Sequence, residues 1–152
     1  NVDKFQIAKH GLSIAQITAA KRGEEVRLDS GEVLPNEALT YRPYRARSYA
    51  YLSDTAFSAK AAGLAAGVDL LYHEATYAAA ERKIARERGH ATTAEAAQAA
   101  LRAGAGRLVI GHFSARYKDL APLLDEARAI FPASELAEEG RTFTIEKRPF
   151  AC

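Results

Sequence analysis

Side chains of the types that bind metal ions occur where predicted secondary-structure elements of this chain end. The set consists of one aspartate, one glutamate and three histidines: Asp54, His73, Glu74, His90 and His112. Neutral imidazole and carboxylate groups are the usual zinc ligands where no thiolate is available. The same residue types also have purely structural roles, because an aspartate caps helices and a histidine packs in a core or binds the carboxyl end of a helix. The residue types alone therefore give a metal site as one hypothesis among several.

The elements that would position these side chains alternate between strands and helices. Polar residues follow three strand-forming runs, at 48–52 before Asp54, at 68–72 before His73 and Glu74, and at 107–110 before His112. Helices are predicted at 53–66, with a cap among residues 53–55, and at 77–88, 92–103 and 120–130. Such alternation implies parallel strand pairs, and ligands gather beyond the carboxyl ends of parallel strands. The pattern therefore predicts an α/β fold with these polar residues at one edge of the sheet.

The two ends of the chain give weaker patterns. Residues 1–21 have mixed periodicity, which predicts a loop with room for one short helix. Residues 24–34 predict a hairpin, and residues 134–137 and 142–145 predict closing strands. We expect the whole chain to belong to one domain, in which residues 1–23 stay poorly assigned.

The composition is that of a globular protein and excludes some classes. Hydrophobic residues make up 48% of the 152 residues and charged residues 26%, and the net charge of +2 is too small to argue for a nucleic-acid partner by itself. No stretch approaches the roughly 20 apolar residues that cross a bilayer, so we expect no membrane partner. The only cysteine, Cys152, excludes an internal disulfide and fits a reducing compartment such as the cytoplasm. Because the chain has no methionine, we expect it to be processed, truncated or partly observed.

Four short strings together resemble the motifs of one enzyme family. They are Tyr-Ala-Tyr-Leu-Ser-Asp-Thr at 49–55, His-Glu-Ala-Thr at 73–76, Gly-His-Ala-Thr at 89–92 and Gly-His-Phe-Ser-Ala-Arg-Tyr at 111–117. In this order they resemble the ribonuclease Z family, which processes the 3′ end of tRNA and belongs to the metallo-β-lactamase superfamily. The resemblance covers roughly residues 24–146. It implies that the chain is the carboxy-terminal half of a single αββα sandwich domain, with a mixed sheet and flanking helices.

The resemblance also implies a role for each matching residue. Asp54 matches an aspartate that bridges two zinc ions, and His112 matches a terminal ligand of one of them. His90 matches the general acid that protonates the departing 3′ oxygen, and Glu74 is the carboxylate expected to orient a loop histidine. Ala91 departs from the family, which has serine in the middle of its His-Ser-Thr string. This departure removes a side-chain hydrogen bond and leaves the proton donor in place.

Three further positions allow more than one role. Ser114 and Arg116 follow His112 closely, and the arginine could pair with the scissile phosphate, although a salt bridge that supports the site accounts for it nearly as well. His73 either faces the site or lies in its wall, and we favour the wall. His10 matches no position of the family's metal motifs, so we assign it no ligand role.

Two groups of basic residues are candidates for binding the RNA backbone. One precedes the strand at 48–52 and the other lies on the helix at 77–88: Arg42, Arg45 and Arg47, and Arg82, Lys83, Arg86 and Arg88. Glu81 and Glu87 dilute the charge of that helix. A solvated helix face is therefore the favoured interpretation there.

The metal site implied by the resemblance is incomplete in this chain. The family's amino-terminal His-x-His-x-Asp-His string is absent, and Asp54 and His112 are fewer than the three protein ligands usual for catalytic zinc. We therefore expect weak metal binding and no hydrolysis by this chain alone. We also expect an exposed apolar surface where the amino-terminal half of the domain would pack.

The function implied by the resemblance is zinc-dependent removal of the 3′ trailer from precursor tRNA. An activated hydroxide would attack a phosphodiester, and the resemblance also suggests a homodimer. Two alternatives stay open. The first is another hydrolase of the same superfold that acts on a phosphodiester or ester of a small molecule, because a fold does not fix a function. The second is a noncatalytic binding module that kept the sheet and lost the metal motif.

Overall fold

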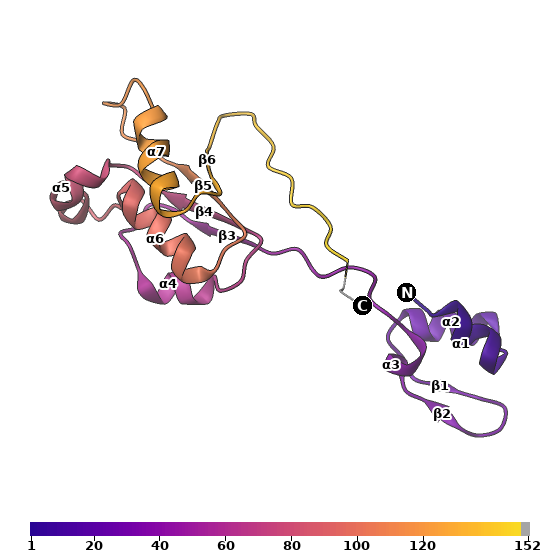
Figure 1. The fold of residues 1–152 in the computed structure, drawn as a ribbon. Helices are drawn as coiled ribbons and strands as arrows, with labels where there is room; N and C mark the ends of the chain where they lie inside the picture. Colours follow the sequence, from indigo (N-terminus) through magenta and orange to yellow (C-terminus); the bar gives the residue numbers. More distant parts are fainter. Residues whose placement is uncertain (150–152) are drawn as a thin grey trace. The chain divides into compact units, whose positions relative to one another are not determined.

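The structure, a computed structural model, describes residues 1–149 and divides the chain into two compact units (Figure 1). One unit consists of residues 1–46 with residues 147–149, and the other of residues 47–146. Cys152, on which the expectation of a reducing compartment rests, lies outside the described residues. That both units belong to one domain of a longer protein stays a prediction.

The smaller unit begins with two helices, which corrects the prediction of a loop with at most one short helix there. α1 spans Lys4–His10 and α2 spans Ile14–Lys21. The side chain of Asp3 caps α1, and Ser13 forms a capping box with Gln16 at the start of α2. Both helices therefore begin at local capping residues, although their apolar residues show no clear helical period.

A hairpin and a short helix complete this unit. β1, Val26–Arg27, pairs antiparallel with β2, Val33–Leu34, which confirms the predicted hairpin. α3 spans Asn36–Leu39. The unit has a small core of its own, made of the buried side chains Val2, Leu12, Ala20, Val26, Leu34 and Leu39.

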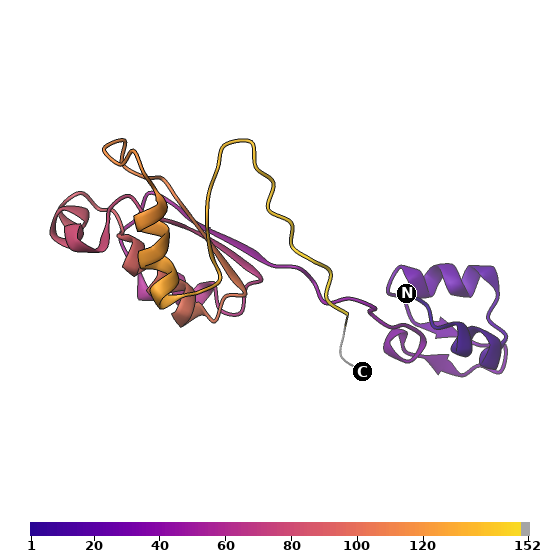
Figure 2. The ribbon, with the colours of Figure 1, turned by 45° about the horizontal axis from the view of Figure 1, so that its top comes forward.

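The larger unit is built on a four-stranded sheet (Figures 1 and 2). Its strands, in the spatial order β3-β4-β5-β6, are Tyr49–Leu52, Leu70–Glu74, Arg107–Gly111 and Ser134–Leu136. Each neighbouring pair is parallel, so the carboxyl ends of the strands meet at one edge, and the predicted α/β class is confirmed. The antiparallel strands of a mixed sheet are not among these four. The strand predicted at 142–145 is wrong, because that segment pairs with no strand in the structure.

Helices bury one face of this sheet. The helices of the unit are α4 Ala59–Leu64, the 3-10 helix η1 Ala79–Glu81, α5 Arg82–Glu87, α6 Thr93–Ala103 and α7 Ala121–Ile130. α4, α6 and α7 lie on the same side of the sheet in Figures 1 and 2. Leu71, Leu108 and Ile110 of the sheet form one buried cluster with Ala96 and Ala100 of α6. Small side chains let α6 approach the sheet closely, so the alanine-rich sequence still forms a packed core. None of the helices in the described part is long and apolar enough to cross a bilayer.

The predicted helix starts have different outcomes. The capping box of Thr92 and Glu95 at the start of α6 is confirmed. The predicted cap of the alanine-rich helix before it is wrong, because α4 is capped by Ser58 instead. Asp54 therefore does not cap a helix, and its carboxylate lies in the loop before α4. The helix predicted at 77–88 is shorter and is divided into η1 and α5.

The other face of the sheet, called the open face below, carries no helix of the described part of the chain and is covered only in part (Figure 2). Leu70, Tyr72 and Val109 line a cavity of about 340 Å³ on this face, beneath the extended chain that follows β6. Tyr49 and Tyr51 are 55% and 60% exposed. The predicted exposed apolar surface is therefore confirmed, and what packs on it stays a prediction.

Candidate metal centre

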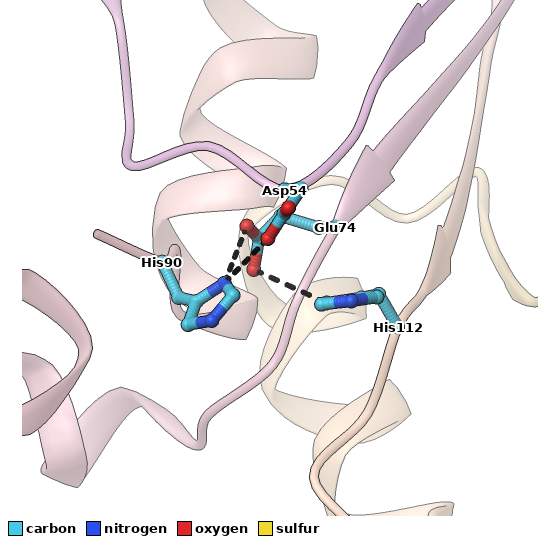
Figure 3. A group of neighbouring side chains, drawn as sticks. All are labelled: Asp54, Glu74, His90 and His112. Atoms are coloured by element: carbon cyan, nitrogen blue, oxygen red, sulfur yellow. Dashed lines mark hydrogen bonds and ion pairs between the residues drawn. The ribbon is translucent and has the colours of Figure 1, made fainter. Parts of the chain in front are cut away.

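Asp54, Glu74, His90 and His112 converge at the carboxyl edge of the sheet (Figure 3). Each offers a ligand atom, and these atoms lie within 4.8 Å of one another. Asp54 follows β3, Glu74 ends β4 and His112 follows β5, so the parallel order of the strands brings three of them together. His90 reaches the same place from the segment between α5 and α6. The group thus contains Asp54, Glu74 and His112 of the residues predicted at this edge, whereas His73, which was predicted there as well, is not part of it.

The backbone is strained at Asp54 and His112. Their φ angles are 52° and 61°, and they are the only non-glycine residues with positive φ in the described part of the chain. A conformation of this kind costs roughly 1–3 kcal/mol and persists only where the surrounding structure holds it. Strain at the two residues that match zinc ligands supports a functional reason for these turns.

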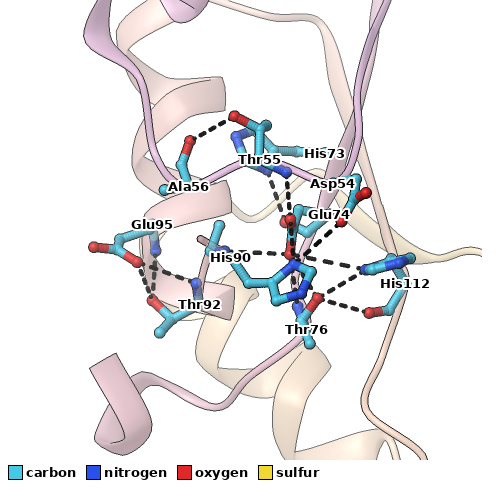
Figure 4. A network of polar contacts seen from close by, with 11 residues as sticks. Asp54, Thr55, Ala56, His73, Glu74, Thr76, His90, Thr92, Glu95 and His112 are labelled. Atoms are coloured by element: carbon cyan, nitrogen blue, oxygen red, sulfur yellow. Dashed lines mark hydrogen bonds and ion pairs between the residues drawn. The ribbon is translucent and has the colours of Figure 1, made fainter. Parts of the chain in front are cut away.

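Glu74 is the buried centre of the group (Figure 4). Its Oε1 accepts hydrogen bonds from the amide of Thr55 at 2.6 Å and from Nδ1 of His90 at 2.9 Å. Its Oε2 accepts from the hydroxyl of Thr76 at 2.6 Å and from the amide of Ala91 at 3.2 Å. Burial raises the pKa of the Glu74 carboxyl, but these hydrogen bonds lower it more, so the net pKa lies below its usual value. The side chain is therefore a carboxylate at neutral pH.

The same carboxylate fixes the proton positions of both histidines. His90 presents Nδ1–H to Glu74, so Nε2 is the ring nitrogen that this contact leaves free. Oγ1 of Thr76 lies 2.9 Å from Nδ1 of His112. The hydroxyl of Thr76 has one proton, and the shorter distance of 2.6 Å to Oε2 of Glu74 indicates that it donates this proton to Glu74. His112 must then carry its proton on Nδ1 and leave Nε2 with a free electron pair. This assignment follows from the hydrogen-bond network.

The residues present fit a borderline cation such as zinc. Nitrogen of imidazole and oxygen of carboxylate are ligands that zinc accepts. The side chains of Asp54 and His112 are 79% and 44% exposed, so both are accessible to an ion. Glu74 is fully buried and accepts hydrogen bonds from five groups, which are the amides of Thr55, Thr76 and Ala91, the hydroxyl of Thr76 and Nδ1 of His90. Its role as an orienting carboxylate stays a prediction.

The two remaining histidines lie outside this group. His73 is 1% exposed, and its Nδ1 is 2.7 Å from the carbonyl oxygen of Glu74. Burial lowers the pKa of His73, so its ring stays neutral. These contacts support the interpretation that it lies in the wall of the site. His10 ends α1 in the smaller unit and belongs to no metal-binding group found among residues 1–149.

Arg116 is held in a salt bridge beside the site. Its Nη1 lies 2.6 Å from Oε1 of Glu81, and its Nε donates to the hydroxyl of Ser114 at 3.3 Å. The guanidinium also lies over the ring of Tyr77, with Cζ 5.1 Å from the centroid. This is the supporting arrangement that the sequence left open as an alternative. Binding of a phosphate by Ser114 and Arg116 stays a prediction.

The basic residues divide between different environments. Arg82 and Arg86 lie 3.0 Å and 3.9 Å from Glu95, and their side chains are 60% and 64% exposed. Lys83 and Arg88 are exposed on the same segment. In the other group, Nη1 of Arg47 donates to a backbone carbonyl at 3.3 Å, and Arg42 and Arg45 lie in the smaller unit. A role of either group in RNA binding stays a prediction.

Thr55, Thr76 and Glu81 are contacts of the site that the sequence analysis missed. Thr76 could have been found, because it ends the His-Glu-Ala-Thr string. Thr55 acts through its backbone amide, and any residue type supplies that group. Nothing near Glu81 in the sequence indicates its contact, because its partner Arg116 lies 35 residues away.

Known proteins resemble this chain over most of its length. Residues 2–113 match the family model of a β-lactamase superfamily domain. Among curated relatives, ribonuclease Z of Parabacteroides distasonis is 48% identical over 134 residues, which cover 88% of this chain and 44% of that protein. Ribonuclease Z of Geobacillus kaustophilus is 43% identical over 129 residues, which cover 84% and 42%. The chain thus spans less than half the length of these relatives.

A solved structure has the same fold. The metallo-β-lactamase fold protein YhfI from Bacillus subtilis superposes with a TM-score of 0.59 at 25% identity. The match covers 63% of this chain and 39% of that protein. The likeness agrees with the parallel sheet and the flanking helices described above.

Proposed function

Since this chain belongs to the ribonuclease Z family of the β-lactamase superfamily, we propose that it is part of a zinc-dependent endoribonuclease that removes the 3′ trailer from precursor tRNA. The observation that carries this proposal is the convergence of two carboxylates and two histidines within 4.8 Å. Their proton positions suit metal binding at one histidine and proton transfer at the other.

Asp54 and His112 would hold the metal. Asp54 lies at a strained turn with its carboxylate exposed, which suits a ligand shared by two ions. His112 would bind through Nε2, because Thr76 and Glu74 fix the proton on Nδ1. Bound zinc would lower the pKa of a water molecule toward neutral pH and would offset the negative charge of the phosphate.

His90 would act as the general acid. Its Nδ1–H is held by Glu74, so the proton for the departing 3′ oxygen comes from Nε2 of the imidazolium. The carboxylate of Glu74 lies 2.9 Å from Nδ1 of His90 and would orient the ring. Ala91 donates to Glu74 through its backbone amide, so the replacement of the family's serine leaves this contact unchanged.

The remaining components of the enzyme would lie outside this chain. We propose that the amino-terminal half of the same domain supplies the missing ligands and packs on the open face of the sheet. The exposed Tyr49 and Tyr51 and the apolar cavity beside them support this. We also propose a cytoplasmic homodimer, with backbone phosphates of tRNA bound by basic residues such as Lys83 and Arg88.

The test measures zinc content and precursor-tRNA cleavage of the full reading frame that contains this chain. Asp54→Ala and His112→Ala should lower bound zinc by more than about tenfold, because ligands matter more than their outer partners. His90→Ala should retain zinc and slow cleavage by about 100-fold or more. His10→Ala, in the smaller unit, is the matched control and should change neither.

Two different results would redirect the proposal. A parent protein that binds zinc and cleaves a small phosphodiester, but not precursor tRNA, would be a different hydrolase of the same superfold. A parent that binds no zinc and cleaves neither substrate would be a noncatalytic member of the family.

A further inference from the structure

The carboxylate of Glu81 binds two consecutive side chains of the loop that carries His112. Oε1 accepts from Nη1 of Arg116 at 2.6 Å, and Oε2 accepts from the hydroxyl of Tyr117. The same hydroxyl accepts from the amide of Ala78 at 2.9 Å. Glu81 ends η1, in the segment that follows β4, so its contacts join that segment to the loop after β5.

The loop is tied to the same segment near its beginning as well. The amide of Ser114 donates to the carbonyl of Thr76 at 3.1 Å, and the amide of Tyr117 donates to the carbonyl of Ser114 at 3.1 Å. Oγ1 of Thr76 lies 2.9 Å from both Nδ1 and the carbonyl oxygen of His112. The residues after His112 are therefore anchored at two points, through Thr76 and through Glu81.

His112 needs such anchors. Its positive φ of 61° is a strained conformation for a residue with a side chain. Its side chain is 44% exposed, so packing does not hold it in place on every side. We propose that Glu81 is a positioning residue, which holds His112 in its metal-binding conformation through Arg116 and Tyr117. This inference rests on the metal site proposed above.

The alternative role of Arg116 makes the opposite prediction. If Arg116 bound the scissile phosphate, Glu81 would compete with that phosphate for the guanidinium, and removing its charge would strengthen substrate binding. If Arg116 and Glu81 position His112, removing either charge weakens metal binding and leaves the KM for RNA nearly unchanged. A lower KM of Glu81→Gln would therefore indicate phosphate binding by Arg116, and an unchanged KM with weaker zinc binding would indicate positioning of His112.

The experiment compares Glu81→Gln, Arg116→Ala and Tyr117→Phe in the full reading frame. The measured quantities are the zinc dissociation constant, obtained by competition with a chelating dye, and kcat and KM on precursor tRNA. We expect Glu81→Gln to weaken zinc binding by about tenfold, the lower end of the cost of losing an outer partner of a ligand. The double variant Glu81→Gln with Arg116→Ala should be little weaker than either single variant, because each change removes the same ion pair between Glu81 and Arg116. Glu87→Gln removes an exposed carboxylate from α5 and is the matched control.

A readout that needs neither zinc nor RNA keeps this inference separate from the proposed function. Hydrogen exchange of the amides of Ser114 and Tyr117 in the zinc-free protein should accelerate in Glu81→Gln and not in Glu87→Gln. If Glu81→Gln fails to fold, Tyr117→Phe, which removes one oxygen, should show the same acceleration to a smaller extent. Unchanged exchange and zinc affinity, or a lower KM in Glu81→Gln, would overturn the positioning role. Failure of the parent to cleave tRNA would count against the proposed function alone.

Discussion

The two faces of the four-stranded sheet differ in how much of their packing this chain supplies. On the helix face, Leu71, Leu108 and Ile110 are all 0% exposed. On the open face, Tyr49 and Tyr51 are more than half exposed, and a cavity lies beside them. The helix face is therefore packed by this chain, whereas the open face is covered only in part: Leu70 and Val109 are buried there, and the tyrosines of β3 leave apolar area that stabilises only when further chain covers it.

The largest expected effect comes from truncating a side chain on the helix face. Leu108→Ala should lower the free energy of unfolding of this chain by about 2–5 kcal/mol, because it leaves a cavity in a fully packed cluster. Tyr51→Ala, the matched change on the open face, should cost about 1 kcal/mol, mainly from its stacking on Tyr72. Urea unfolding measures both. Equal costs would mean that the open face is covered in solution, and the contrast between the faces would be lost.

A smaller effect is expected where the open face approaches the site, at Gly111. A Cβ at this position would lie 2.6 Å from the hydroxyl oxygen of Tyr72 and 2.9 Å from Cβ of Ala137. Gly111→Ala should therefore cost about 1–3 kcal/mol by overpacking. Tyr72→Phe in the same background should recover part of this, because it removes the nearest atom from a ring on the open face. No recovery would leave two unyielding neighbours, Cβ of Ala137 and the ring carbon Cε2 of residue 72 at 3.0 Å, and Ala137→Gly would separate them.

The smallest expected effect is on the pH dependence of stability, and it separates two adjacent residues of β4. Burial lowers the pKa of His73 from 6.5, so as the pH falls below 6.5 the unfolded chain binds a proton that the folded chain does not, and stability decreases. Burial alone would raise the pKa of Glu74, but its hydrogen bonds bring it below 4.5. The stability that the ionised Glu74 contributes to the folded state is therefore present above pH 4.5, and it is lost as the pH falls through the pKa of Glu74 in the folded protein.

Acid titration of urea unfolding, in zinc-free buffer, would resolve these two contributions. His73→Gln should flatten the decrease that begins at pH 6.5, and Glu74→Gln the decrease that begins at pH 4.5. The control His10→Gln should leave both slopes unchanged. A Glu74→Gln profile that keeps the slope of the parent would show that this carboxyl is not held ionised by its hydrogen bonds.

Local signals in the sequence predicted those parts of the fold that depend on near neighbours. The capping box of Thr92 and Glu95 and the hairpin of β1 and β2 are examples, since their contacts span few residues. The strand expected at 142–145 is the opposite case. Strand-forming residues make a strand only beside a free partner, and here Arg47 and Arg107 bind the carbonyls of Ile145 and Thr144 instead.

In the candidate site, too, the pattern of neighbouring residues predicted some features, and contacts between distant segments determine the others. The alternation of strands and helices predicted that Asp54, Glu74 and His112 would share one edge of a sheet, and they do. The positive φ angles of Asp54 and His112 were not predictable, because non-glycine residues adopt them only under contacts made across the fold. The salt bridge of Glu81 was also beyond prediction, since it joins segments 35 residues apart.

The arrangement around Glu74 has a consequence for redesigning this centre. One carboxylate holds His90 directly and His112 through the single proton of Thr76. A different side chain at position 112, chosen to suit another metal, would change which group the hydroxyl of Thr76 donates to. This would alter the hydrogen bonds of the Glu74 carboxylate, which also binds His90. If His112 binds the metal and His90 delivers the proton, as proposed, the two functions would be coupled, and both histidine positions would have to be optimised together.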